Sequence, residues 1–238
     1  MAIYVERRMD VPLEAVWSHT QDPTLHERWD LRFTDIAYLP RDDDSSPQRF
    51  RFATRLGFGL AVEGTGETVG ERHLADGSHA SALRFGSGQA RSLIRDGSGY
   101  WKYVPDGDGV RFITAYDYGV RWGRLGRMID RLAFRPLIGW ATAWSFDRLA
   151  LWLEEGIDPA AAGRRSLVHA VAQVVLLALA TGASLPRPPV ERAWLVAAVA
   201  AAGAVVLAAR HGTPRATRCL RRPGTSIAGR STVAAGSG

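Results

Sequence analysis

Residues 48–56, QRFRFATRL, have the clearest periodicity in the chain. Phe50, Phe52 and Thr54 lie at every second position. Arg49, Arg51, Ala53 and Arg55 occupy the positions between and beside them. Successive side chains of a β-strand point to opposite faces of its sheet, so this strand has one mainly apolar face and one cationic face. The pattern predicts an antiparallel strand with one face on a core and the other in solvent.

The elements around this strand are predicted in the same way. Upstream we expect a strand at 2–9, a helix at 13–20, and a second short helix that starts after Asp22 and ends near Trp29. Downstream, alternating segments are separated by polar or glycine-rich turns, and these predict further strands. The expected strands other than 2–9 and 48–56 are 32–39, 60–71, 78–85, 92–104 and 110–118.

The periodicity becomes helical after the last strand. Apolar residues at helical spacing run from Leu125 to Leu153, and Pro136 is expected to break or kink this helix. The second half, 137–155, is predicted as one long amphipathic helix. This order predicts an α+β helix-grip fold: a curved antiparallel sheet and two short helices, with a long C-terminal helix across the concave face.

The opening of the chain carries a family resemblance. Residues 5–17, VERRMDVPLEAVW, resemble the start of the SRPBCC superfamily, the START-like, polyketide cyclase/dehydrase-type domains. The resemblance covers residues 1–155 and implies a deep apolar cavity that holds lipids, sterols, polyketides or other hydrophobic molecules. Residues 134–148 are also similar to a segment that precedes membrane helices in DoxX-like fusion proteins.

Two uncharged segments follow the helix-grip region. Residues 167–185 and 193–209 contain no Asp, Glu, Lys or Arg. As helices they would span about 28 Å and 25 Å, close to the thickness of a bilayer core. Trp194 occupies the position of an interfacial aromatic residue. We predict a transmembrane hairpin; the alternative is a pair of buried helices in a soluble bundle.

Charge is concentrated at the C-terminal end. The formal net charge is +6, and the segment 210–238 contains six arginines and no acidic residue, so the rest of the chain is formally neutral. This distribution predicts contact with an anionic lipid surface rather than with nucleic acid. Arg164 and Arg165 precede the hairpin, so the positive-inside rule places both of its ends in the cytoplasm at the plasma (inner) membrane. The charged residues 1–10 predict no signal peptide. The expected organisation is a helix-grip domain at 1–158, a linker at 159–165, the hairpin at 166–210 and a basic, disordered tail at 211–238.

Aromatic and hydroxyl-bearing residues are the candidate lining of the cavity. Ordinary core packing is the alternative for each of them. The candidate ligand-binding residues are Trp17, Trp29, Phe52, Thr54, Tyr116, Tyr118, Trp140 and Trp144.

Catalytic and metal-binding motifs are not recognised in the sequence. His73 and His79 flank a turn and are expected to be solvated, and the pair His26 and Asp30 is expected to be a surface contact. The single Cys219 excludes an internal disulfide and a cysteine-rich zinc site. We therefore expect no catalytic residue, no metal and no cofactor.

The leading functional hypothesis is a membrane-tethered module that binds a small lipid-like or polyketide-like ligand in an internal cavity. The first alternative is a cyclase or aromatase-type enzyme, in which Tyr116, Tyr118 or a cavity arginine polarises a ketone while His26 or Asp30 moves protons. The second alternative is a protein-interaction head of a membrane complex with a collapsed cavity.

Overall fold

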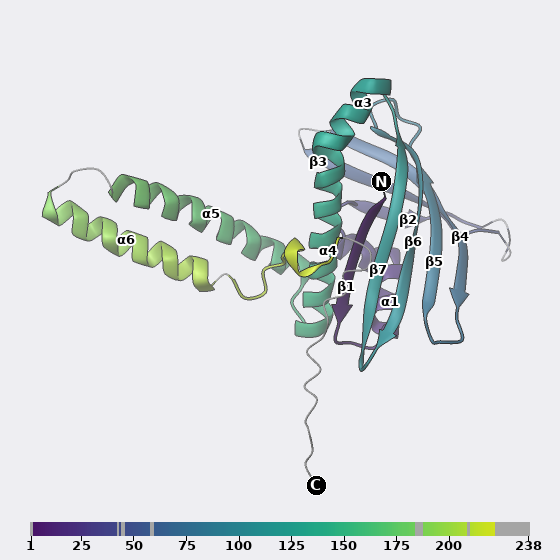
Figure 1. The fold of residues 1–238 in the computed structure, drawn as a ribbon, viewed down its shortest axis with the longest axis horizontal. Helices are drawn as coiled ribbons and strands as arrows, with labels where there is room; N and C mark the ends of the chain where they lie inside the picture. Colours follow the sequence, from purple (N-terminus) through teal and green to yellow (C-terminus); the bar gives the residue numbers. More distant parts are fainter. Residues whose placement is uncertain are drawn as a thin grey trace, which may run out of the picture.

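A computed structural model describes residues 2–41, 43, 46–57, 60–183, 188–208 and 210–221. The predicted order of a strand, two short helices, six strands and a long helix is confirmed within these residues (Figure 1). The elements are β1 (Ile3–Met9), α1 (Leu13–Gln21), α2 (Pro23–Trp29), β2 (Asp35–Tyr38), β3 (Arg49–Gly57), β4 (Leu60–His73), β5 (His79–Gly86), β6 (Ile94–Asp106), β7 (Gly109–Val120), α3 (Gly123–Ile129), the π-helical turn η1 (Asp130–Phe134), α4 (Arg135–Glu155), α5 (Pro159–Ala183), α6 (Pro189–Ala208) and the 3-10 turn η2 (Ala216–Arg218).

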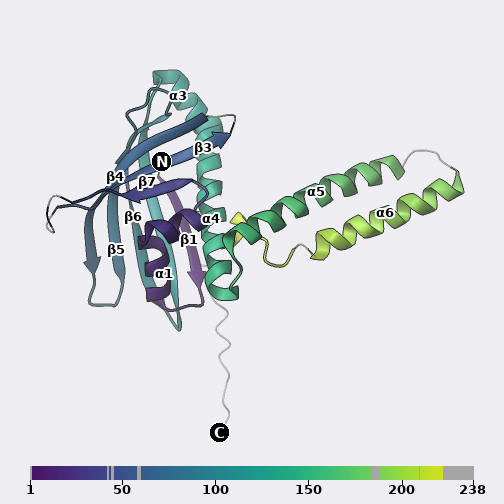
Figure 2. The ribbon, with the colours of Figure 1, turned by 180° about the vertical axis from the view of Figure 1, so that it is seen from behind.

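The seven strands form one antiparallel sheet in the order β1-β7-β6-β5-β4-β3-β2. The sheet curves around α1, and α4 runs along the same side (Figures 1 and 2). Between sheet and helix the rings of Phe112 and Phe146 stack with centroids 4.3 Å apart, and Trp29 packs edge-on against both. All three side chains are fully buried, so this end of the domain is a solid core.

The predicted alternation of β3 is present in the sheet. Phe50 pairs with Gly66 of β4, and Phe52 pairs with Gly64. The two rings lie over these glycines, where any β-carbon would collide with ring atoms. Glycine in β4 therefore lets the phenylalanines of β3 lie flat along the inner face, which is how aromatic residues cover glycine positions in sheets.

The helix after the sheet does not break at Pro136. Instead the chain runs continuously through α3, η1 and α4, and the π-helical turn lies just before the proline. Pro136 lies in the first turn of α4 directly after the π turn, so its missing N–H falls where the regular α-helical bonding is already interrupted. The wider π turn changes which residues of α4 face the sheet.

The two helices after α4 extend away from the sheet as an antiparallel pair (Figure 1). The expected linker at 159–165 is helical and forms the first part of α5, which begins against the domain with Ala162 fully buried. A helix that starts with Pro159 after the exposed Asp158 cap needs no separate connector, because the proline suits the first turn.

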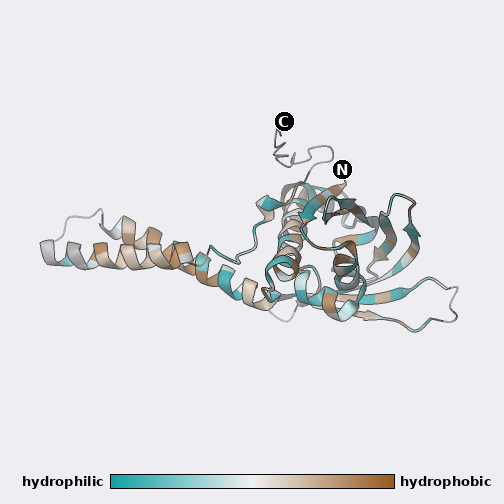
Figure 3. Cartoon of the chain, turned by 90° about the horizontal axis from the view of Figure 1, so that it is seen from below, coloured by the Kyte–Doolittle hydropathy of each residue, from teal (hydrophilic) through white to brown (hydrophobic). Residues whose placement is uncertain are grey.

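One helix among the described residues is long and apolar enough to cross a membrane. It is Pro159–Thr181, 23 residues with a mean hydropathy of 1.2, and its apolar window is only 6% buried. The apolar part of α6, Trp194–Leu207, is shorter. Figure 3 shows apolar residues along both helices and hydrophilic residues at the base of α5. The break between the helices at 184–187 lies outside the described residues.

The segment 210–221, which we call the strap, returns to the domain. Glu6 of β1 and Leu220 exchange two backbone hydrogen bonds of 2.9 Å, and Cys219 is buried against α4. The expected disorder is therefore wrong for this first part of the tail, because edge-strand pairing and burial of Cys219 order it. The remainder, 222–238, lies outside the described residues.

Candidate functional site

A cavity of about 590 Å³ lies on the inner face of the sheet and is the candidate ligand site. This volume lies within the range of pockets that bind drug-sized molecules. Strands β3–β7 form its wall, α2 and the following loop form a second side, and α4 contributes Ile138 and Ala141. The collapsed interior required by the interaction-head hypothesis is therefore absent from the described part of the domain.

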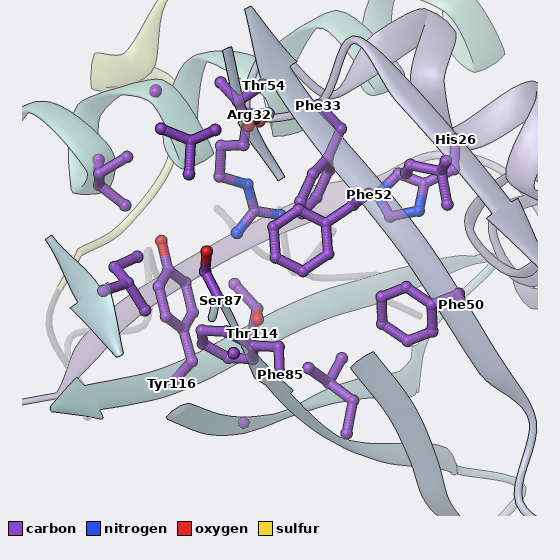
Figure 4. Close-up of a pocket in the computed structure, with 18 of the residues that line it drawn as sticks. His26, Arg32, Phe33, Phe50, Phe52, Thr54, Phe85, Ser87, Thr114 and Tyr116 are labelled. Atoms are coloured by element: carbon purple, nitrogen blue, oxygen red, sulfur yellow. Dashed lines mark hydrogen bonds between the residues drawn. The ribbon is translucent and has the colours of Figure 1, made fainter. Parts of the chain in front are cut away.

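Phenylalanine rings make much of the cavity wall (Figure 4). Phe33, in the loop after α2, meets Phe52 edge-on with centroids 5.4 Å apart. Phe50 lies beside Phe52 at 6.4 Å, and Phe85 approaches Tyr116 at 6.3 Å. Apolar walls of this kind favour a ligand that loses mostly hydrophobic surface on binding.

A buried ion pair supports one side of the cavity. The carboxylate of Asp30 accepts hydrogen bonds from Arg32 Nε at 2.9 Å and Nη2 at 2.5 Å, and from His26 Nε2 at 3.0 Å. Asp30 is 1% exposed and the Arg32 side chain is 12% exposed. The expected surface contact between His26 and Asp30 is thus wrong: α2 packs its last turn inwards, where His26 stacks on Trp29.

The ionisation of this pair follows from its geometry. Burial by itself would raise the pKa of Asp30, but the charge of Arg32 and the hydrogen bonds from Arg32 and His26 outweigh it and hold that pKa well below its ordinary range. Burial would lower the pKa of Arg32, and the Asp30 charge more than reverses this, so the pKa is raised. Asp30 is a carboxylate and Arg32 a cation throughout the neutral pH range.

Tyr116 lines the cavity, and its hydroxyl proton is donated to Thr142. The Thr142 hydroxyl donates to the backbone carbonyl of Ile138 at 2.8 Å, so it can only accept in its 2.7 Å bond with Tyr116 Oη. Tyr116 must therefore be the donor to Thr142. Burial also raises the pKa of Tyr116, which keeps the phenol protonated. Tyr116 cannot polarise a ligand carbonyl without giving up this bond.

Three of the eight candidate binding residues line the cavity, namely Phe52, Thr54 and Tyr116. Thr54 donates to the backbone carbonyl of Arg32 and so also positions the arginine. Figure 4 shows all three around the guanidinium of Arg32.

The other five candidates lie outside the cavity. Trp17 packs on His79 and Tyr103, and Trp29 is in the solid core. Tyr118 points to a separate groove at the β1 edge and donates to Asp130 at 2.7 Å.

Trp140 and Trp144 stack on each other away from the cavity, Trp144 packs against the core, and the guanidinium of Arg148 covers Trp144 at 5.2 Å. Trp140 is 42% exposed. The expected inward orientation of the two tryptophans is wrong because the register of α4, set by the π turn, directs Ile138 and Ala141 inwards instead.

Sequence reasoning missed Arg32 and Phe33 as lining residues. Both lie in the loop between α2 and β2, which we expected to be part of a strand starting at residue 32. The available signal was the Asp30-Leu31-Arg32 spacing directly after a helix. Asp30 ends α2, and its Oδ1 also accepts from the Arg32 backbone N–H at 3.0 Å, which turns the arginine side chain inwards.

The histidines at the β4–β5 turn pack against each other and against Trp17. The rings of His73 and His79 are 4.1 Å apart and both lie near Trp17, so His79 is less solvated than expected. Within the described residues, no group of three or more His, Cys, Asp or Glu side chains could hold a metal ion.

The described start of the basic tail contacts protein. The backbone N–H of Arg215 and the guanidinium of Arg218 bind Asp147 Oδ2 at 2.6 Å and 3.3 Å. Burial raises the pKa of Asp147, against the hydrogen bond from Arg215 and the charges of Arg218 and Arg7. Arg218 is thus an anchor for the strap rather than a free cation for lipid.

No family model matches the chain. The chain is 50% identical over 168 residues to the uncharacterized membrane protein YndG of Bacillus subtilis (strain 168), an alignment of 70% of this chain and 62% of that protein. The chain thus spans less than two thirds of the length of this relative.

Solved structures with a similar fold include START-type proteins. They are a STAR-related lipid transfer protein from Xanthomonas axonopodis (15% identity, TM-score 0.47, 64% of this chain and 85% of that one) and a START superfamily protein from Mycobacterium smegmatis (18%, 0.44, 66% and 99%). The di-domain ARO/CYC StfQ from the steffimycin biosynthetic pathway is also similar (13%, 0.46, 66% and 52%).

Proposed function

We propose that this protein binds a small hydrophobic molecule in the cavity of a SRPBCC-like domain and holds that domain at a membrane through α5 and α6. The observation that carries the proposal is the 590 Å³ cavity, walled by Phe33, Phe50, Phe52 and Phe85. Burial of apolar ligand surface contributes roughly 25 cal/mol per Å² and would supply most of the affinity.

Membrane attachment is supported by the surface of the two distal helices. Leu167, Val174 and Leu177 of α5 are each about two-thirds exposed. In α6, Trp194 is 75% exposed and Leu207 is 63% exposed. A lipid phase would cover these side chains, whereas water would not. The relative YndG is described as a membrane protein, in agreement with this role.

The proposed orientation has the domain and both ends of the helix pair in the cytoplasm at the inner membrane. Arg164 and Arg165 lie at the base of α5, and Arg210 lies beyond the end of α6. This arrangement of cations follows the positive-inside rule. The strap then lies on the same side as the domain, because both its neighbours in space, β1 and α4, belong to the domain.

The test is ligand capture by the full-length chain in lipid nanodiscs. We expect Nile red fluorescence to rise on binding, and mass spectrometry to find apolar molecules that co-purify with the protein. Ala141→Phe should fill the cavity from α4 and abolish both signals, whereas Ala133→Phe, on the exposed side of the same continuous helix, should leave them unchanged. Equal binding by the wild type and Ala141→Phe would refute the cavity as the binding site.

A cyclase or aromatase-type enzyme is the second candidate. It is favoured by the positions of Arg32 and His26, which both line the cavity. In this function Arg32 would polarise a ketone and His26 would transfer the proton, since Tyr116 donates to Thr142 and Tyr118 lies outside the cavity. Turnover of a polyketide-like substrate that is lost in His26→Gln, with Nile red binding intact, would support this candidate.

A further inference from the structure

Arg32 is the buried cation of the cavity. The other charged residue on the lining, Arg91, is exposed, whereas Arg32 reaches the interior. Its guanidinium carbon lies 5.3 Å from the Phe33 ring centre and 5.4 Å from the Tyr116 ring centre. A second buried arginine, Arg148, donates to the backbone carbonyls of Arg28 and Pro159 and does not line the cavity. A ligand that enters therefore meets a single buried guanidinium.

The guanidinium has donor capacity left after its ion pair is made. Arginine carries five N–H groups, and Asp30 engages Nε and Nη2 along one edge. The Tyr116 hydroxyl is a second hydrogen-bond partner of the guanidinium, and the remaining N–H groups have no carboxylate partner among the described residues. Figure 4 shows the guanidinium turned towards the part of the cavity that holds Tyr116 and Ser87.

The hydroxyl groups around Arg32 cannot replace it as donors. Each of them already donates to an acceptor of the protein, so each oxygen can only accept further hydrogen bonds at this site. These donations are Thr54 to Arg32 O, Ser87 to Glu63 O, Ser92 to Ile94 O, Thr114 to Tyr100 O and Tyr116 to Thr142 Oγ1.

We propose that the ligand carries one uncharged oxygen acceptor, a ketone, ester or quinone carbonyl, that accepts a hydrogen bond from Arg32 while its apolar body lies against the phenylalanine wall. This inference rests on the proposed function and names the class of molecule bound. Without such an acceptor, an apolar ligand would strip water from the free N–H groups of Arg32 and leave them unpaired, which is costly.

A carboxylate fits this site less well than a carbonyl. Asp30 already occupies the Nε/Nη2 edge of the guanidinium, and it already balances the charge of Arg32. A second carboxylate would bury a negative charge without a matching cation. The site thus distinguishes a lipid-like ketone or ester from a fatty acid of the same length.

The experiment compares three probes of equal chain length on the full-length chain in nanodiscs. The probes are 2-dodecanone, n-dodecane and dodecanoate, and each is measured at pH 7.5 by displacement of Nile red. We expect 2-dodecanone to bind about 10-fold or more tightly than n-dodecane, as a hydrogen bond to a charged group provides. Dodecanoate should bind more weakly than 2-dodecanone.

The key variant is Asp30→Asn/Arg32→Met, which removes both charges together and leaves no unpaired ion. It keeps an oxygen at position 30 for His26. We expect it to retain n-dodecane and to lose the preference for 2-dodecanone. Ser81→Ala is the matched control, because Ser81 also lines the cavity but its hydroxyl makes no side-chain hydrogen bond within the described residues; it should keep the preference.

Failure of the ketone preference and failure of ligand binding give different results in this experiment. Binding of n-dodecane without a preference for 2-dodecanone would overturn the inference and leave the proposed function in place. Tighter binding of dodecanoate, or a ketone preference that survives in the double variant, would also overturn it. If no probe displaces Nile red, the cavity does not bind such molecules and both proposals fail.

Discussion

Asp147, near the middle of α4, accepts a 2.6 Å hydrogen bond from the backbone N–H of Arg215, 68 residues later in the chain. The carboxylate is fully buried, and Arg7 and Arg218 approach it at 3.6 Å and 3.3 Å. This contact spans the whole of the distal helix pair. It therefore joins the end of that pair to the helix from which it departs.

We predict that Asp147 controls access to Cys219. The thiol is 5% exposed, and burial raises its pKa to about 12, so it should react very slowly with a maleimide at pH 8. Asp147→Ala removes the acceptor for Arg215 and the charge opposite Arg218, and labelling should accelerate about 10-fold or more. Glu155→Gln, an exposed change on α4, is the control; an unaltered rate in Asp147→Ala would contradict the role of the strap.

A chain that ends at Asp158 should be less stable than the full-length domain. It retains the buried Asp147 but lacks the N–H of Arg215, the charge of Arg218 and the edge pairing of Leu220 with Glu6. We expect a loss of about 2 kcal/mol or more, measured by urea unfolding with tryptophan fluorescence.

The same comparison contains its own control. Asp147→Leu should cost less in the shortened chain than in the full-length chain, because the strap that uses the carboxylate is missing there. Equal costs in both chains would show that Asp147 and the strap do not cooperate.

The Asp30–Arg32 pair should make the domain sensitive to acid. The pKa of Asp30 is lowered in the folded state, so its contribution to stability is present above the unfolded value of about 3.9 and is lost as the pH falls towards the folded value. Asp30→Asn leaves Arg32 buried without its counterion and should cost about 3–5 kcal/mol at pH 7.

The measurement is the urea midpoint at pH 7 and at pH 3.5. The wild type should lose stability over this range by more than Asp30→Asn does. A variant whose acid response matches the wild type would remove Asp30 as the group responsible.

The direction of the Tyr116–Thr142 hydrogen bond predicts unequal effects of removing either hydroxyl. Tyr116→Phe removes a donor and leaves Thr142 bonded to Ile138, so it should cost about 0.5–1.5 kcal/mol. Thr142→Val leaves the buried phenol proton without its acceptor and should cost about 1–3 kcal/mol. A larger cost for Tyr116→Phe would mean that the proton lies the other way.

Some of the fold could be read from the sequence because one period dominates each segment. The alternation of Phe50, Phe52 and Thr54 depends only on the geometry of a strand, and these three side chains face inwards as that geometry requires. Tyr116 was found in the same way. The π turn at Asp130–Phe134 has no comparable signature, and its effect on the register of α4 keeps Trp140 and Trp144 out of the cavity.

The burial of Asp30 and Arg32 could not be predicted from the sequence, for a different reason. Asp30 and Arg32 resemble an ordinary surface pair in the sequence, and only the packing of α2 shows that both are buried. The order of the strap could not be predicted either, because an arginine-rich segment after a membrane-type helix usually makes no fixed contact with a folded domain. Its order depends on Asp147, Glu6 and other partners that are distant in sequence.

The strap also determines how the domain can turn. A domain on one flexible stalk can swivel, but this chain leaves at the end of α4 and comes back to the middle of the same helix. Two attachment points resist torsion as well as separation. The mouth of the cavity must therefore keep a fixed orientation relative to the distal helices. A rotation of those helices would be transmitted first to α4.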